Sequence, residues 1–254
     1  DSGAFTDGSD HASAGISGKT VWNFTTADIA ATWDGGGLDN NWSTDANWVG
    51  DVAPASGADL VFPADALHLS NDNDFVSGTS FGSIQISGSG YTLGGNAIEL
   101  NGSVTSSGMD NKFALPLQLG SNGGFSGSSG TFTVSHAIDT NGFNLSLQSV
   151  GTSTQLVVSG VISGSGTVSS DGGGTVALAG DNSYSGITTI SDGPLAVRHG
   201  NALGTGDNTA DTGTVIANNS GRVQLEDGIT VASEHLSGSN VNLFSSGSGQ
   251  RVVW

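Results

Sequence analysis

The stretch from residue 160 to residue 204 consists of short runs of alternating residues with turn-forming residues between them. The runs are 175–178 (TVAL), 187–190 (ITTI) and 195–197 (LAV), and Gly, Asn, Asp and Ser fill the gaps. Alternation with a period of two predicts β-strands, and the Gly, Asn, Asp and Ser clusters predict turns. Each strand is too short to bury a core alone, whereas strands stacked in parallel on further turns can share one. The stretch therefore predicts a solenoid.

Within this stretch, residues 174–197 read GTVALAGDNSYSGITTISDGPLAV. The segment resembles the passenger-associated transport repeat of bacterial autotransporters, and the flanking GVISGSGTV and NALGTG fit what surrounds that repeat. The resemblance implies an all-β protein, a right-handed parallel β-helix displayed outside the cell. It gives the motif an architectural role and transfers no catalytic residue. The matching positions are Gly174, Thr175, Leu178, Gly180, Asn182, Tyr184, Gly186, Thr188, Ile190, Gly193 and Leu195.

We divide the chain of 254 residues into three parts. Residues 1–19 are polar and aperiodic, which predicts a flexible or extended N-terminal arm. Residues 20–59 are rich in Trp and are expected to form a cap with the first strands, and residues 60–254 are expected to form the β-helix, with the repeat at about 160–204. The hydrophobic fraction of 35% is low for a compact globule. A β-helix tolerates it, because each turn contributes only a few inward side chains.

Further strand-like runs occupy residues 60–148, each followed by Gly, Asn or Ser. Pro116 lies inside the run 113–119, so we expect that strand to contain a bulge or bend. Asn residues at the turns, Asn182 among them, are interpreted as side chains that tolerate the left-handed backbone conformation. The predicted inward positions are Ile84, Ile86, Leu93, Ile98, Leu100, Leu115, Leu117 and Leu119.

Four of the five Trp residues lie between residues 21 and 48. Trp33, Trp42 and Trp48 allow two interpretations. They could cap the open first turn and cover its unpaired strand edge. Alternatively, exposed rings could form a platform on which sugars stack. A solenoid needs a cover at its first turn, and this favours the cap.

The charge of the chain limits its partners. It has 23 acidic residues against 5 Lys and Arg, a formal net charge of −18, so binding to nucleic acid is not expected. No apolar run approaches the ~20 residues that span a bilayer, so we predict no membrane insertion of this chain. Cys is absent, which neither requires nor excludes an oxidising compartment. An extracellular or bacterial cell-surface location fits these features.

Catalytic and metal-binding signals are weak. Asp192, Arg198 and His199 form the only acid–base cluster inside the repeat, and exposed turn residues explain it better than catalysis. We therefore predict that the chain is not an enzyme. We also predict no cofactor and no metal, with calcium as the alternative left open, because acidic turns offer hard oxygen ligands. The candidate ligands would be Asp34, Asp39, Asp72 and Asp74.

The sequence predicts a non-enzymatic, extracellular structural or adhesive β-helical protein that resembles an autotransporter passenger. The alternative is a self-assembling subunit of a filament or surface layer, joined head to tail or by strand addition. A carbohydrate-binding or carbohydrate-active β-helix is less favoured. Expected partners are further copies of the chain in an oligomer or polymer, with cell-surface glycans as an alternative. Candidate subunit contacts are Val21, Trp22, Val252, Val253 and Trp254.

Overall fold

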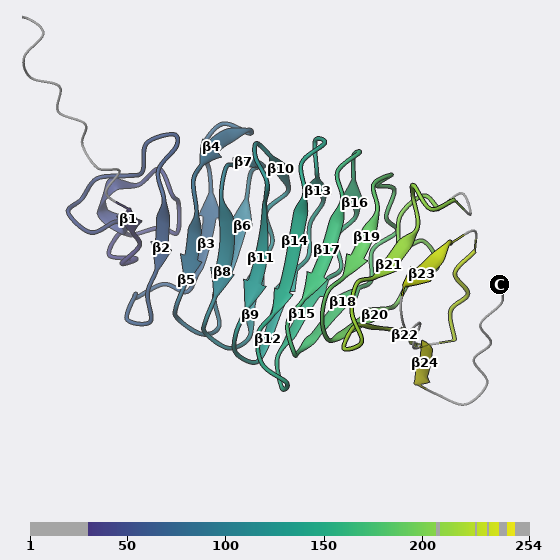
Figure 1. The fold of residues 1–254 in the computed structure, drawn as a ribbon. Coiled ribbons are helices and arrows are strands. Elements are labelled where there is room, and N and C mark those ends of the chain that lie inside the picture. The colour runs from purple at the N-terminus through teal and green to yellow at the C-terminus, as the bar shows by residue number, and fades with distance from the viewer. Residues whose placement is uncertain (1–29, 207–208, 227, 233, 239–242, 247–254) are drawn as a thin grey trace, which may run out of the picture.

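The computed structural model describes residues 30–206, 209–226, 228–232, 234–238 and 243–246. In these ranges the chain forms three parallel sheets that stack turn upon turn along one axis, a β-solenoid of about 8 turns (Figure 1). The one helix of these ranges is the short 3-10 turn η1 (Asp45–Asn47), so none of them holds a helix long and apolar enough to cross a membrane. The predicted parallel β-helix is confirmed. The predicted arm 1–19 and the candidate subunit contacts near residues 21 and 253 lie outside the described residues.

From β2 to β16, successive strands go to the three sheets in rotation. The first sheet has ten strands: β1 (Ala31–Thr32), β2 (Leu60–Phe62), β5 (Ile84–Ile86), β8 (Ser103–Ser106), β11 (Gly123–Gly127), β14 (Leu145–Ser149), β17 (Val168–Asp171), β19 (Thr188–Ile190), β21 (Thr214–Ile216) and β23 (Leu236–Gly238). The second has nine: β3 (Ser70–Asn73), β6 (Thr92–Gly95), β9 (Asn111–Phe113), β12 (Thr131–Val134), β15 (Gln155–Val158), β18 (Thr175–Leu178), β20 (Pro194–Val197), β22 (Arg222–Glu226) and β24 (Leu243–Ser246). The third has five: β4 (Thr79–Phe81), β7 (Ile98–Leu100), β10 (Leu117–Leu119), β13 (Ile138–Asp139) and β16 (Ile162–Ser163).

The turns differ in length, although their strands stay in register. Leu60 pairs with Ile84, and Ile84 pairs with Val104, so these two turns take 24 and 20 residues. Near the C-terminal end, Ile190 pairs with Ile216 across 26 residues. The inward positions remain aligned because the additional residues are placed in the corners between strands. Insertions in such corners cost little, since the strands on both sides keep their partners.

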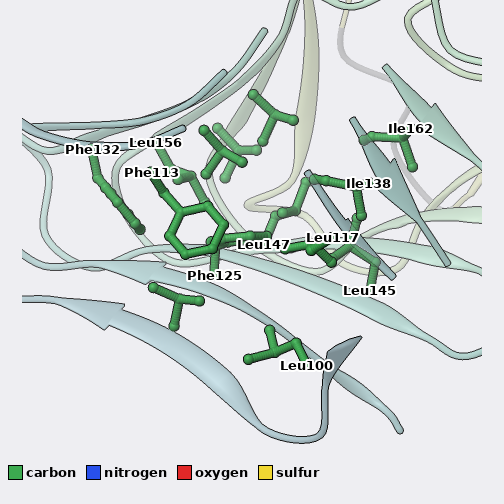
Figure 2. Packing of buried hydrophobic residues seen from close by; sticks show 14 of the residues in the cluster. Leu100, Phe113, Leu117, Phe125, Phe132, Ile138, Leu145, Leu147, Leu156 and Ile162 are labelled. Carbon is green, nitrogen blue, oxygen red and sulfur yellow. The ribbon is translucent and has the colours of Figure 1, made fainter. Parts of the chain in front are cut away.

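Alternating residues of all three sheets point into one continuous core. In Figure 2, Leu100 and Leu117 of the five-stranded sheet converge with Leu147 of the ten-stranded sheet and with Phe113 and Leu156 of the nine-stranded sheet. All eight predicted inward residues are buried, and Leu117, at 4%, is the most exposed of them. Burying a side chain of this size contributes about 1.5–3 kcal/mol, so stacked columns of apolar residues stabilise the fold without any large apolar segment.

Pro116 lies at a corner and not inside a strand. The run 113–119 is divided between β9, which ends at Phe113, and β10, which begins at Leu117. The run is therefore two strands and not one, and the bend expected at Pro116 is the corner where the chain passes from one sheet to another. Proline has no backbone N–H to donate to a ladder, and a corner does not require one. The Pro116 carbonyl accepts a hydrogen bond from Ile98 N at 3.0 Å, which starts the pairing of the third sheet in this turn.

The third sheet ends at β16, at the point where the transport-repeat segment follows. From β17 onward, strands of the described residues belong to the ten-stranded and nine-stranded sheets alone. Residues 179–187 take the third side of the solenoid without forming a strand. Their backbone still follows the turn below, because Ser183 N donates to Ile162 O at 2.8 Å and Ser185 N donates to Gly164 O at 3.0 Å.

Candidate functional site

Three Trp rings close the first described turn. Trp33, Trp42 and Trp48 are 0%, 0% and 1% exposed, and all three pack around Phe62, with ring centroids 5.6–6.1 Å away. Trp33 and Trp48 also contact each other edge to face at 5.3 Å, an arrangement that aromatic pairs favour. A sugar platform needs an exposed ring face, and none of these rings has one. Their burial fits the predicted cap, which stays a prediction.

Each indole N–H of this cap has a partner. Trp42 Nε1 donates to Asn71 Oδ1 at 2.7 Å, Trp33 Nε1 donates to His68 O at 2.8 Å, and Trp48 Nε1 donates to Trp42 O at 2.8 Å. Large rings can be buried in full here because their polar atoms are satisfied. The cap also pairs with the edge of the nine-stranded sheet, since Trp42 N donates to the carbonyl of Asp72 at 2.9 Å.

The four calcium candidates do not converge on one ion site. Asp39 accepts bonds from Asn41 N, Thr44 Oγ1 and Asn47 Nδ2, and these, the Asn41 bond first, hold the pKa of its carboxyl below the usual value. Asp74 accepts both of its bonds from Ser43, and Asp34 accepts one from Gly36 N. The part of the chain that the structure describes holds no group of three His, Cys, Asp or Glu residues able to ligate a metal.

Asn182 of the repeat replaces part of the missing third strand, and Tyr184 of the same segment is buried in the core. Asn182 is 3% exposed, its Oδ1 accepts a bond from Ile162 N at 2.8 Å, and its Nδ2 donates to Ala202 O at 2.6 Å. A side-chain amide thus links the turn below to the turn above, as a strand would. The Tyr184 hydroxyl shares a 2.6 Å hydrogen bond with Thr188 Oγ1, and burial raises the pKa of Tyr184 well above its usual range.

The remaining repeat positions set the spacing between turns. A Cβ on Gly180 would collide with the carbonyl oxygen of Gly160, and one on Gly186 would collide with that of Gly166. Gly193 has φ +65°, which favours glycine. These glycines therefore mark close approaches of neighbouring backbones. The other matching positions form strands or lead into them: Gly174, Thr175 and Leu178 at β18, Thr188 and Ile190 in β19, and Leu195 in β20.

The acid–base cluster expected inside the repeat is not brought together. Arg198 Nε lies 2.6 Å from Glu226 Oε2, and His199 Nδ1 lies 3.7 Å from Asp181 Oδ1. Asp192 instead accepts a bond from Gly193 N at 2.8 Å. Arg198 thus links two turns, a structural role that needs no catalytic partner.

The sequence does not predict two features of the C-terminal turns. The Glu234 carboxylate accepts a 2.6 Å bond from Thr214 Oγ1, and burial raises the pKa of Glu234 to about 7. Glu234 lies outside any strand-like run, so no pattern marks it. The second feature is a hollow of about 430 Å³ between Asp192 and Arg222. Its sequence signal is the five-residue corner 217–221, which is longer than the two three-residue corners directly beneath it, 172–174 and 191–193.

The comparisons with known proteins agree with this architecture. A family model described as the passenger-associated transport repeat matches residues 171–197. The adhesin BmaC autotransporter of Brucella suis biovar 1 (strain 1330) is 34% identical over 101 residues, which cover 40% of this chain and 3% of that protein. No solved structure matches the chain. Repeat, relative and β-solenoid together fit an autotransporter passenger that carries a passenger-associated transport repeat.

Proposed function

We propose that this chain is a segment of an exported, non-enzymatic surface protein that acts as an adhesin-like autotransporter passenger. The observation that carries the proposal is the transport repeat at residues 171–197, which is built into the solenoid, since its Asn182 side chain bonds the turns on both sides. The relative is named an adhesin, which supports a role in attachment. Arg198 and His199 pair with separate acids, which supports a structural role for the charged residues of the repeat.

Attachment by such a chain depends on the lateral surface of the solenoid, because the core is filled by apolar columns. The test is adhesion of fluorescent beads that carry the purified chain to cultured epithelial cells. We expect saturable attachment that soluble chain inhibits in proportion to its concentration. Beads coated with serum albumin, also an acidic protein, control for charge. Attachment no greater than that of the albumin beads would overturn the proposal.

A second candidate function is self-assembly. Six of the nine exposed large apolar side chains in the described residues belong to the first turns, and Leu38, Leu67 and Val76 among them are 107%, 75% and 82% exposed. Apolar side chains gathered near one end of a solenoid favour contact with another copy. Electron microscopy with light scattering tests this. Fibres or sheets that Leu38→Ser and Val76→Ser together abolish would support it, and monodisperse rods of monomer mass would exclude it.

A further inference from the structure

Three successive corners of the solenoid enclose a hollow on its outer surface. The corners connect the ten-stranded sheet to the nine-stranded sheet: residues 172–174 follow β17, residues 191–193 follow β19, and residues 217–221 follow β21 (the strands are labelled in Figure 1). The first two corners have three residues and the third has five, so the third projects beyond those beneath it. The hollow has a volume of about 430 Å³ and is lined by Gly173, Asp192, Gly193, Asn219, Ser220, Gly221 and Arg222.

Glycines keep this hollow open. A Cβ on Gly173 would meet no atom closer than 3.7 Å, so the space beside it is free. Gly193 is restricted to glycine by its φ of +65° and by the Gly172 carbonyl that a Cβ would strike. The long corner is held in shape from within, because Asn218 Oδ1 accepts bonds from Ser220 N at 2.9 Å and Gly221 N at 3.1 Å. The corners around the hollow are therefore held by glycine backbone and by the Asn218 side chain.

The lining carries one acid and one base that are not paired with each other. Asp192 uses Oδ1 to accept the Gly193 N–H at 2.8 Å, which fixes the carboxylate beside the hollow. The Arg222 backbone N–H donates to Gly193 O at 3.1 Å, while its guanidinium has no acidic group within ion-pair distance in the described ranges. Among the described residues Arg222 differs in this from Arg198, which has Glu226 as its partner. The guanidinium is thus available for a ligand.

We propose that this hollow binds one neutral sugar residue of a cell-surface glycan, an inference that rests on the proposed adhesive function. A carboxylate accepts hydrogen bonds from hydroxyls, and a guanidinium donates two parallel bonds to oxygens, so together they match a pair of neighbouring sugar hydroxyls. One positive and one negative group make the lining neutral overall, which suits an uncharged ligand. The volume lies within the ~300–1,000 Å³ of ligand sites.

The lining also limits the affinity. It includes no aromatic ring, so the stacking that strengthens many sugar sites is absent from this one. We therefore expect dissociation constants in the millimolar range for a monosaccharide. Attachment of a cell would then depend on many chains acting together, as multivalent binding allows.

Nuclear magnetic resonance on the full chain tests the site, because glycine amide signals fall in a separate region of the spectrum. The probes are methyl α-mannoside, methyl β-galactoside and N-acetylglucosamine, with glucuronate as the charged comparison. We expect at least one neutral sugar to shift the amide signals of Gly173, Gly193 and Gly221 in a saturable manner. Absence of any shift at these glycines, or tighter binding of glucuronate than of every neutral sugar, would overturn the proposal.

Two variants preserve shape while they remove the charges: Asp192→Asn and Arg222→Gln. We expect each to weaken sugar binding at least tenfold, whereas Lys112→Gln, on the exposed face of β9, leaves it unchanged. Equal sugar binding by wild type, Asp192→Asn, Arg222→Gln and Lys112→Gln would overturn the assignment.

Bead adhesion separates this site from the proposed function. Beads that adhere although their chain binds no sugar contradict the sugar site alone. Sugar binding without any bead adhesion contradicts the adhesive function.

Discussion

Replacing Asn182 by Ala tests whether a side chain stands in for a strand in the repeat. The substitution removes the acceptor for Ile162 N and the donor to Ala202 O. Both partner residues are 0% exposed, so water cannot replace the lost bonds. A buried backbone group left without a partner costs about 1–3 kcal/mol, and two such groups cost about 2–6 kcal/mol. We expect Asn182→Ala to lower the free energy of unfolding by this amount.

Urea unfolding followed by far-ultraviolet circular dichroism measures the change, and hydrogen exchange at the Ile162 amide reports it locally. The matched control is Asn201→Ala, because Asn201 bonds Asp181 Oδ1 at 2.8 Å at the exposed surface. The control is expected to cost less than about 1 kcal/mol. If Asn182→Ala destabilises no more than Asn201→Ala, and the Ile162 amide stays protected, the side chain is not a substitute for a strand.

Asn182→Asp refines the test. An ionised carboxylate can still accept the bond from Ile162 N, but it cannot donate to Ala202 O, which lies 2.6 Å from Asn182 Nδ2. Only the protonated acid can make both bonds, so burial and the facing carbonyl should raise the pKa of the new carboxyl above its unfolded value. The variant should therefore lose stability as pH rises through that raised pKa, relative to wild type. A pH-independent difference between the two proteins would contradict this reasoning.

Three further predictions concern other parts of the solenoid. Gly180→Ala should destabilise strongly because its Cβ would meet the Gly160 carbonyl, whereas Gly173→Ala, with open space, should stay within about 1 kcal/mol of wild type in urea unfolding. Trp42→Ala should cost about 3–5 kcal/mol in the same assay, since the ring is fully buried; a cost under about 1 kcal/mol would contradict its packing role. The Glu234 carboxyl has a folded pKa of about 7 against an ordinary 4.5, so its contribution to stability is present below about 4.5 and lost as pH rises through 7. Urea midpoints of Glu234→Gln should lack that pH dependence, and an unchanged slope would contradict it.

Much of the fold follows from the sequence because period-two alternation fixes which side chains point inward. Residues such as Ile84 and Leu119 are predicted inward and are fully buried. The corners are harder to predict, as Pro116 shows: strand-like residues continue on both sides of it, while the chain changes sheets there. Local propensity measures how a residue fits a strand, but not the sheet to which the strand belongs.

The role of Asn182 illustrates a second limit. Asn is common at turns because it tolerates positive φ, and Asn141, at φ 49°, behaves in this way. Asn182 also lies outside any strand, yet it is buried and its side chain bonds two neighbouring turns. The difference depends on residues 20 positions away in either direction, which a local pattern does not reveal. The hollow beside Arg222 is hidden for the same reason, since it arises from three corners that meet only when the turns stack.

Because each turn of the solenoid contacts mainly its neighbours, a local defect should destabilise the adjacent turns more than distant ones. Loss of Asn182 weakens the connection between the turn of Ile162 and the turn of Ala202, while the Trp cap lies several turns away. Stability in such stacks is a sum of repeat and nearest-neighbour contributions, so the turns near the defect can unfold before the cap. In a chain with Trp22→Phe and Trp254→Phe, Trp emission reports the cap alone. Asn182→Ala in that chain should then show an earlier midpoint by circular dichroism than by emission, and coincident midpoints would mean that the solenoid unfolds as one cooperative unit.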